Sequence, residues 1–279
     1  MRPGPRVNGP GRLARGITMN NKTTICVAAT AVICCMSGAN AWAQDSETRF
    51  VLSTGVERDI GDYGGSYDIE ELYVPLIASI SNDRVGFRVT VPYLSVKSPI
   101  DDTSAATETE SGLGDISLSA TLYNVIQSPQ LGLVVDVLAG VKLGTADVDK
   151  GLGTGENDFT LRTDAFKFFD EVTLFASAGY RWRGDPEGVD IDDVMLASIG
   201  AAYFTATDDL MGLTFDFRES SYAGNDDIQE LTAFYSHRFN DSFDLELYAL
   251  TGFGDSSPDF GAGLRVSTDI RMRGFWSRD

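Results

Sequence analysis

Cysteine is almost absent from this chain. All three cysteines (Cys26, Cys34 and Cys35) lie in the first 43 residues. The remainder therefore has no disulfide framework, no thiolate nucleophile and no cysteine-ligated metal. Histidine is just as scarce, since His237 is the single one in the sequence. Because general acid–base catalysis most often uses histidine, we expect no enzymatic activity, no cofactor and no bound metal.

Long apolar runs are missing as well. After Ala43 no stretch of 18 apolar residues occurs, whereas a membrane-spanning helix needs about 20. Basic residues are few: residues 1–43 hold five of the 22, so residues 44–279 carry 17 basic and 41 acidic residues and a formal charge of −24. Without a basic cluster we expect no nucleic-acid partner. These absences leave a soluble periplasmic protein or a membrane β-barrel, whose strands each need only about 9–11 residues.

The first 43 residues have the pattern of a leader with a secretory signal peptide. Met19, which we take as the true start, opens a short basic segment with Lys22, and Ile25–Met36 is a run of twelve apolar residues. Ala41-Trp42-Ala43 matches an A-x-A cleavage site, so cleavage after Ala43 would leave residues 44–279 as one domain. The alternative is a transmembrane anchor, for which twelve residues are too short, because the hydrocarbon is about 30 Å thick.

Apolar and polar residues alternate with a period of two through the mature part, and helical periodicity is missing. From Val85 to Tyr93 every second residue is apolar, with Arg88 and Thr90 between them. This period is typical of strands with one apolar face. The pattern predicts strands over residues 48–57, 66–80, 84–97, 112–126, 131–144, 158–169, 171–183, 191–205, 208–219, 227–239, 242–253 and 259–272.

The connections between these strands alternate in length. Those after even-numbered strands are tight, as at Ser81-Asn82-Asp83 and Asn240-Asp241. Those after odd-numbered strands are longer and polar: 58–65, 98–111, 145–157, 184–190, 220–226 and 254–258. Bacterial outer-membrane barrels have an even strand number, short periplasmic turns and longer external loops. We therefore predict an all-β, transmembrane antiparallel β-barrel of about twelve strands with both termini in the periplasm.

Aromatic residues near the predicted strand ends support a membrane location. They are expected to form the girdles at the two membrane interfaces, although aromatics also favour strands in general: Tyr93, Tyr180, Trp182, Tyr235, Phe239, Phe243 and Phe253. The outward register of the last strand continues to Trp276, which resembles a terminal signal for barrel assembly. His237 shares the outward parity of Tyr235 and Phe239, so we expect its side chain to face lipid near the periplasmic rim. At that position it would not belong to a catalytic triad, which needs a solvated pocket.

Charged residues of both signs recur on the inward faces of the predicted strands, among them Glu71 and Asp269. The candidates for lining the lumen are Arg88, Asp115, Asp136, Lys142, Arg162, Asp164, Arg181, Asp216, Glu230, Glu246 and Arg265. In a water-filled channel these residues would tune solute selectivity, and in a closed barrel they would form buried ion pairs. The sequence leaves both arrangements open.

Three acidic clusters fall in the predicted external loops, at residues 190–193, 225–227 and 255–259. Carboxylate oxygens are the ligands that hard cations favour. Solvated loop charge is the simpler interpretation, and we predict no metal site.

Two stretches resemble a known family. Gly112-Leu-Gly-Asp-Ile116 opens a predicted strand, and Val141-Lys-Leu-Gly-Thr145 ends another and is followed by Lys150-Gly-Leu-Gly-Thr-Gly-Glu-Asn-Asp-Phe159. Together they are similar to the outer-membrane phenol-degradation meta-pathway family of β-barrels. The resemblance implies a transporter of aromatic or other hydrophobic compounds.

The main hypothesis is thus a passive channel or transporter for small, hydrophobic or aromatic solutes, exported to the outer membrane of a Gram-negative bacterium. One alternative is a structural or adhesive barrel with a closed lumen and partner-binding acidic loops, and another is a barrel enzyme such as a lipid hydrolase. The expected partners are outer-membrane lipid and lipopolysaccharide, the barrel assembly machinery and a small hydrophobic solute.

Overall fold

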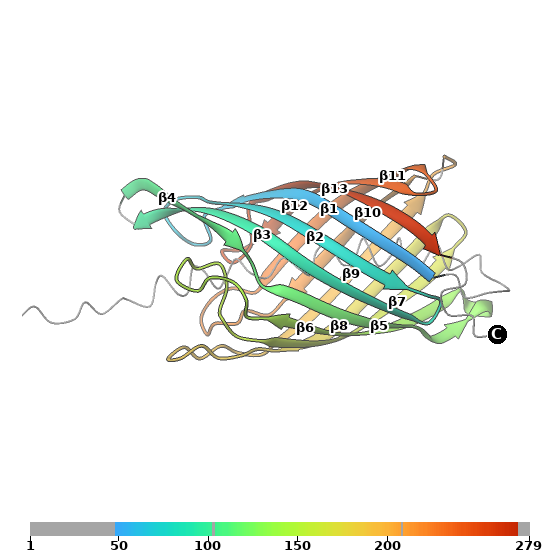
Figure 1. The fold of residues 1–279 in the computed structure, drawn as a ribbon, viewed down its shortest axis with the longest axis horizontal. Coiled ribbons are helices and arrows are strands. Elements are labelled where there is room, and N and C mark those ends of the chain that lie inside the picture. The colour runs from blue at the N-terminus through green and yellow to red at the C-terminus, as the bar shows by residue number, and fades with distance from the viewer. Residues whose placement is uncertain (1–47, 102–103, 208, 273–279) are drawn as a thin grey trace, which may run out of the picture.

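The computed structural model describes residues 48–101, 104–207 and 209–272. They form antiparallel strands joined by turns and loops, with a 3₁₀ turn at Pro129–Leu131 (Figure 1). The strands are β1 (Thr48–Gly61), β2 (Ile69–Ser81), β3 (Val85–Asp101), β4 (Ser104–Leu113), β5 (Ile116–Ser128), β6 (Leu133–Leu143), β7 (Asp158–Phe169), β8 (Val172–Trp182), β9 (Val194–Phe204), β10 (Leu210–Arg218), β11 (Ile228–Asn240), β12 (Phe243–Phe253) and β13 (Phe260–Met272).

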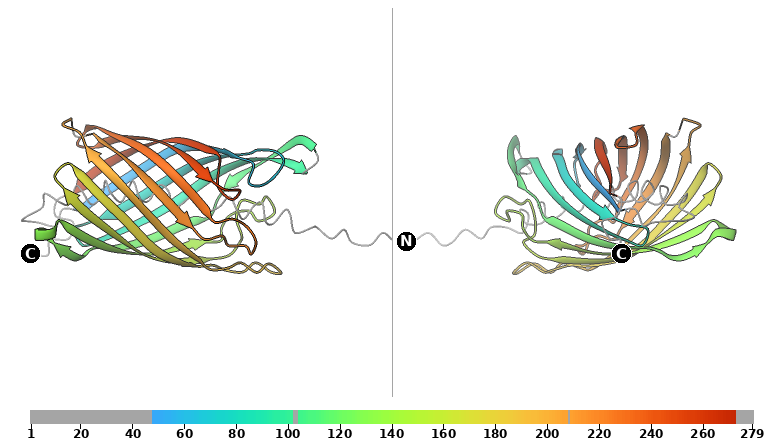
Figure 2. Two further views of the ribbon diagram at one scale, coloured as in Figure 1. Left: turned by 180° about the vertical axis from the view of Figure 1, so that it is seen from behind. Right: turned by 45° about the vertical axis from the view of Figure 1, so that its right-hand side comes forward.

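The strands close into a barrel (Figure 2). Closure comes from β1, which pairs with β13 in a register that runs from Thr48↔Met272 to Ile60↔Phe260. The sheet has thirteen segments, but β4 and β5 both pair with β3. They are two parts of one barrel strand, interrupted at residues 114–115, so the barrel has twelve strands. The predicted fold class and strand number are confirmed.

The prediction was wrong for residues 98–111, which we expected to form an irregular loop. β3 continues to Asp101 and β4 returns from Ser104, so this region is a β-hairpin that projects beyond the rest of the barrel (Figure 1). Its backbone ladder extends from Tyr93↔Leu113 to Asp101↔Ser104. The hairpin lacks an apolar face, because a segment outside the hydrocarbon has no need of one. Alternation therefore could not reveal it.

Short turns and long loops alternate along the chain as predicted. The short turns cover residues 82–84, 129–132, 170–171, 205–209 and 241–242, and the long loops 62–68, 144–157, 183–193, 219–227 and 254–259. In the turn between β2 and β3, Asn82 Oδ1 accepts hydrogen bonds of 2.9 Å from the backbone N–H groups of Arg84 and Val85. The start of β1 and the end of β13 lie at the end with the short turns, which is the periplasmic end in bacterial barrels.

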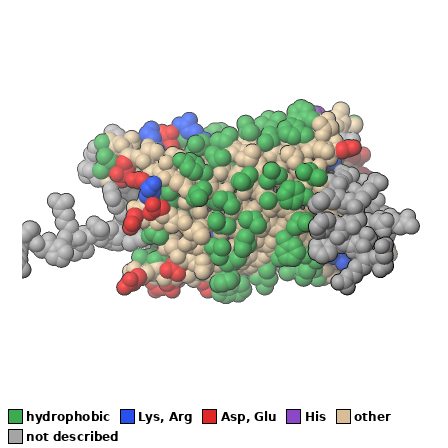
Figure 3. All heavy atoms as spheres, viewed as in Figure 1, with side chains coloured by type: hydrophobic (Ala, Val, Ile, Leu, Met, Phe, Trp, Pro, Cys, Tyr) green, Lys and Arg blue, Asp and Glu red, His purple; other side chains and the backbone are tan. Residues whose placement is uncertain are grey.

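An apolar belt surrounds the middle of the barrel. Outward side chains such as Leu76, Ile199 and Leu213 are 51%, 64% and 53% exposed. Figure 3 shows hydrophobic side chains across the middle of the barrel and acidic side chains gathered at one end. In water, each Å² of such apolar surface costs about 25 cal/mol relative to an apolar environment. The belt therefore indicates contact with hydrocarbon.

Aromatic side chains mark both edges of this belt. Phe159, Trp182 and Phe253 are about half exposed near the external strand ends, and Phe87 and Phe239 are similarly exposed near the periplasmic ends. This is the arrangement of interfacial girdles. Over the part of the chain that the structure describes, no helix is long and apolar enough to cross a membrane.

His237 lies at an outward position near the periplasmic end of β11. Its Nδ1 is 2.5 Å from Asp209 Oδ1, and its ring packs edge-on against Phe239 with centroids 4.6 Å apart. The hydrogen bond from His237 lowers the pKa of the Asp209 carboxyl. The histidine thus connects the turn before β10 to β11, which is a structural role.

Two predicted features lie outside the described residues. They are the leader over residues 1–43, with its cleavage site after Ala43, and the terminal aromatic Trp276.

Replacing Ile199 with arginine tests whether hydrocarbon covers the outer face. Ile199 lies in the middle of β9, opposite Ala176 and Phe215. An arginine near the bilayer midplane destabilises a transmembrane barrel by roughly 2–4 kcal/mol, so Ile199→Arg should lower the free energy of unfolding in lipid vesicles by that amount, measured by urea titration. Val148→Arg is the control, because Val148 is 41% exposed in the β6–β7 loop. Equal losses in the two variants would contradict a hydrocarbon cover.

Candidate functional site

The charged residues predicted to line the lumen occupy inward positions. Arg88, for example, lies between Phe87 and Val89, which are 57% and 40% exposed on the outer face. The structure places Arg88 on β3, Asp115 at the interruption between β4 and β5, Asp136 and Lys142 on β6, Arg162 and Asp164 on β7, Arg181 on β8, Asp216 on β10, Glu230 on β11, Glu246 on β12 and Arg265 on β13. All but Arg88 and Lys142 are buried.

Many of these charges pair along the barrel wall. Lys142 Nζ lies 2.7 Å from Asp115 Oδ2. Arg162 Nε lies 2.9 Å from Asp164 Oδ1 two residues along the same strand, and Arg265 pairs with Glu246 on the adjacent strand. A buried ion is tolerated when a hydrogen-bonded opposite charge accompanies it. These pairs neutralise one another within the wall, so they need no partner from across the lumen.

Asp115 stabilises the interruption between β4 and β5. Its Oδ1 accepts hydrogen bonds from the backbone N–H groups of Thr145 and Ala146, at 3.0 and 2.9 Å, and its Oδ2 accepts one from Lys142 Nζ. The carboxylate provides acceptors for backbone groups at a point where the ladder stops. It thereby attaches the start of the β6–β7 loop to the wall.

The β6–β7 loop reaches across the external end of the inner wall to β2 and β3. Its Leu152 is 1% exposed. Leu152 belongs to an apolar cluster with Ile69, Tyr73, Leu94, Val96 and Ala146. At Gly144 an added Cβ would lie 2.2 Å from the backbone of Gly155, so the two ends of the loop approach this closely only because residue 144 is glycine. The loop therefore narrows the external mouth.

Several buried charges at strand ends were missing from the predicted set. Asp158, the first residue of β7, lies 3.5 Å from Lys142 Nζ and 3.7 Å from Arg183 Nε. Arg183 Nη1 in turn donates a 2.6 Å hydrogen bond to Ser221 Oγ in the β10–β11 loop. This network joins β6, β7 and two loops at the external mouth. The inward parity of Asp158 and Arg183 was visible in the sequence. The predicted strand ends were too uncertain to decide whether these residues lie in the wall or in a loop.

The inner wall also carries an apolar cluster that sequence reasoning missed. It consists of Phe166, Phe175, Ala202, Leu210, Phe234 and Tyr248, at inward positions of β7 to β12. Here both faces of a strand are apolar, which weakens the alternation. The poor alternation over residues 158–169 and 191–205 was the available signal.

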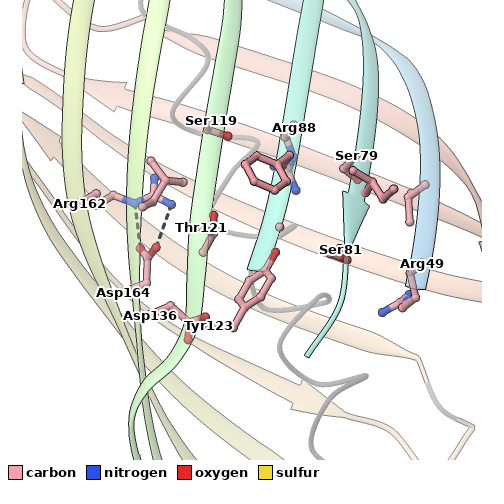
Figure 4. A pocket seen from close by; sticks show the side chains of 15 residues that line it. Arg49, Ser79, Ser81, Arg88, Ser119, Thr121, Tyr123, Asp136, Arg162 and Asp164 are labelled. Carbon is pink, nitrogen blue, oxygen red and sulfur yellow. Dashed lines mark hydrogen bonds and ion pairs between the residues drawn. The ribbon is translucent and has the colours of Figure 1, made fainter. Parts of the chain in front are cut away.

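Two adjacent hollows lie on the inner wall. The first extends toward the periplasmic end, where Arg49, Ser81 and Tyr123 line it (Figure 4). The second extends toward the external end, where Lys142 and Arg181 line it, and it has about 850 Å³ of unoccupied space, including space open to solvent. Four residues line both hollows: Arg88, Ser119, Leu138 and Arg162.

Acidic residues of the external loops accept hydrogen bonds within the loops. Asp193 accepts one of 2.9 Å from the Arg183 N–H, and Asp227 accepts one of 2.9 Å from the Ser220 N–H. Within the described residues, no group of three or more His, Cys, Asp or Glu side chains is arranged to hold a metal ion. The observed role of these carboxylates is to stabilise loop conformations.

The fold is similar to those of solved outer-membrane proteins. An outer-membrane channel from Pseudomonas putida F1 superimposes with a TM-score of 0.66 and 14% identity, over 82% of this chain and 97% of that one. The KdgM porin superimposes with a TM-score of 0.51 and 8% identity, over 78% of this chain and 98% of that one. These similarities establish the outer-membrane barrel fold. The comparison with curated protein sequences gave no match.

The sequence pattern of one protein family matches residues 45–271, which include both motifs of the expected resemblance and nearly every strand residue. The chain belongs to the family described as the MetA-pathway of phenol degradation, a family of outer-membrane β-barrels.

Proposed function

We propose that the protein is a passive outer-membrane channel for small solutes that have an apolar part. Membership of the family, the barrel fold and the apolar belt support this role. The similar protein from Pseudomonas putida F1 is named an outer-membrane channel. Passive diffusion requires no catalytic residue, and we propose no enzymatic step.

The observation that carries the proposal is the pair of adjacent hollows, which share four lining residues. One reaches Arg49, the second residue of β1, near the periplasmic end. The other reaches Lys142, near the external end of β6. Because they share residues at mid-height, they support one path along the lumen, where the lining residues set selectivity.

The lining of this path supports solutes that combine apolar and polar groups. Tyr73, Ile77 and Leu138 lie beside the hydroxyl-bearing Thr90 and Ser117. Apolar side chains next to polar groups that can fix the orientation of a ligand are typical of sites for small organic molecules. Strongly hydrated ions would gain less from such a surface, because they retain their water.

Export to the outer membrane is the second part of the proposal. We propose that synthesis starts at Met19, that the leader is removed after Ala43, and that the assembly machinery inserts the barrel among outer-membrane lipid and lipopolysaccharide. The position of the first strand at the short-turn end supports this order of events.

The mature N-terminus is the first expected outcome. Genes that start at Met1 or Met19 should both yield an outer-membrane protein that begins at Gln44, because the same A-x-A site is cleaved. N-terminal sequencing and intact mass of the purified protein measure this. Ala43→Leu should leave a longer precursor. A purified barrel that retains residues of the leader would contradict the proposed processing.

Solute flux tests the channel itself. Proteoliposomes should swell in isotonic solutions of a small solute, and planar bilayers should show discrete conductance steps. Heat-unfolded protein is the control, and heat-dependent migration in gels verifies folding. If folded protein gives neither swelling nor conductance, the closed structural barrel becomes the better description and the channel proposal fails.

The mouth loop gives a third expected outcome. Asp115→Asn removes the negative charge beside Lys142, and breaking a buried ion pair costs roughly 3–5 kcal/mol. The β6–β7 loop should detach more often, giving a several-fold faster proteolytic cleavage within residues 144–157 and noisier single-channel current. Asp147→Asn is the control, because the Asp147 carboxylate contacts only the N–H groups of Asp149 and Lys150 within its own loop among the described residues. Equal effects in both variants would contradict the anchoring role of Asp115.

A further inference from the structure

The external hollow has the opposite charge character to the rest of the chain. The protein carries a formal net charge of −19. Among the described residues that line this hollow, none is acidic and five are basic: Arg88, Lys142, Arg162, Arg181 and Arg265. Carboxylates of the wall neutralise Lys142, Arg162 and Arg265, so the positive charge available to an occupant of the hollow comes from the remaining basic residues.

Arg88 differs from the other basic residues of the hollow. Lys142, Arg162 and Arg265 are each paired with a carboxylate, and Arg181 Nε donates a 3.2 Å hydrogen bond to Thr160 Oγ1. The Arg88 guanidinium makes no hydrogen bond or ion pair with any residue in the described ranges, although it lines both hollows. Its charge therefore faces the path that a solute would follow.

Small residues form the part of the inner wall between Arg88 and Arg181, which we call the floor of the external hollow. The strand ladders place Arg88 beside Ser119, Ser119 beside Gly140, Gly140 beside Thr160, and Thr160 beside Arg181. Adjacent strands are about 4.8 Å apart, so these four steps separate the arginine backbones by roughly 19 Å along the wall. A Cβ added at Gly140 would meet its nearest neighbours at 3.6–3.8 Å, an ordinary contact distance. A methyl group would therefore fit at Gly140 without a clash, and the glycine leaves that space open to the hollow.

Figure 4 shows the neighbouring hollow, where Ser119 and Thr121 lie between Arg88 and Arg162. Arg162 is directed to Asp164, as the dashed lines mark. Ser119 stands directly opposite Arg88 in the β3–β5 ladder and offers a hydroxyl donor on the same face. A guanidinium with an adjacent hydroxyl suits a carboxylate, which accepts two hydrogen bonds from arginine.

We infer that this hollow binds a small organic anion, namely a carboxylate with an aromatic or aliphatic body. Its carboxylate is held by Arg88 and Ser119, and its body lies against Ile77, Leu138 and Leu196. The acidic external loops do not prevent this, because at physiological ionic strength charges more than about 8 Å apart are largely screened in solvent. The inference rests on the proposed channel function and names its solute class.

Benzoate is the probe, and benzyl alcohol is its uncharged counterpart. In planar bilayers, benzoate should reduce the KCl current of the wild-type protein, and Arg88→Gln should raise the half-blocking concentration roughly tenfold, because a charged hydrogen bond is lost. Arg88→Lys should retain part of the block. Benzyl alcohol should act equally on the wild type and on Arg88→Gln.

Two further variants distinguish the effect of the Arg88 charge from the effect of the open volume beside Gly140. Arg84→Gln removes the same charge in the exposed β2–β3 turn, and it should leave the benzoate block unchanged. Gly140→Leu fills the floor and should weaken the block while the folded barrel still shows heat-dependent migration. An equal half-blocking concentration in the wild type and Arg88→Gln would overturn the inference.

Calorimetry on the folded protein in detergent distinguishes the inferred site from the channel. Benzoate binding that Arg88→Gln abolishes supports the site, even if no conductance is found and the channel proposal fails. Conductance with neither benzoate block nor benzoate binding overturns the site and leaves the channel in place.

Discussion

Closure of the backbone hydrogen-bond ring is the constraint on which the rest of this structure depends. Hydrocarbon offers no partners for N–H and C=O groups, so a sheet that crosses a membrane must have no free edge. The β1–β13 ladder removes the last edge, which lies between the two ends of the described chain. Once the ring is closed, every second side chain must face lipid. Apolar residues such as Ile199 and Leu213 occupy these positions.

The same constraint directs the charged residues of the membrane-crossing parts of the strands inward, whereas charged residues near the external strand ends, such as Arg58 and Glu70, pair with each other on the outer face. The enclosed space is narrow, because twelve strands give a diameter between that of a filled and that of a wide open barrel. The charges are accommodated by pairing with neighbours on the wall, as Arg162 does with Asp164 and Arg265 with Glu246. Pairs of this kind lie flat along the wall. Because the paired side chains extend along the wall, the inner face can be charged while the hollows beside it stay open.

The interruption between β4 and β5 shows how one strand serves two environments. β5 pairs with β3 and β6 in the barrel wall, whereas β4 pairs with β3 and continues from the wall into the hairpin beyond it. Asp115 occupies the junction, and its carboxylate binds the backbone of Thr145 and Ala146. The break therefore provides the anchor for the loop that narrows the mouth. Entry of a solute and the shape of the external end are physically connected through this one residue.

Two apolar clusters lie on the inner wall, toward opposite ends of the barrel. Leu152 and its neighbours form a cluster at the external end, and Phe166 and its neighbours form another toward the periplasmic end of the opposite wall. Among the described residues of these two clusters, Tyr73 also lines a hollow, and it supports the proposed passage of solutes that have an apolar part.

The sequence alone determined the strands and their inward faces, because lipid imposes a strict period of two. The strand predicted over residues 84–97 alternates clearly and lies in β3 from Val85 on, and the parity of Arg88 and Glu246 on their strands is visible without coordinates. Only the tertiary structure decided which charges meet. Asp115 and Lys142 are 27 residues apart, and their contact depends on the register of β5 against β6. The polar hairpin at residues 98–111 and the isolation of Arg88 were equally hidden. The hairpin lies outside the membrane, so the membrane imposes no alternation on its sequence. The partners of Arg88 depend on how the neighbouring strands are aligned, which the local sequence does not specify.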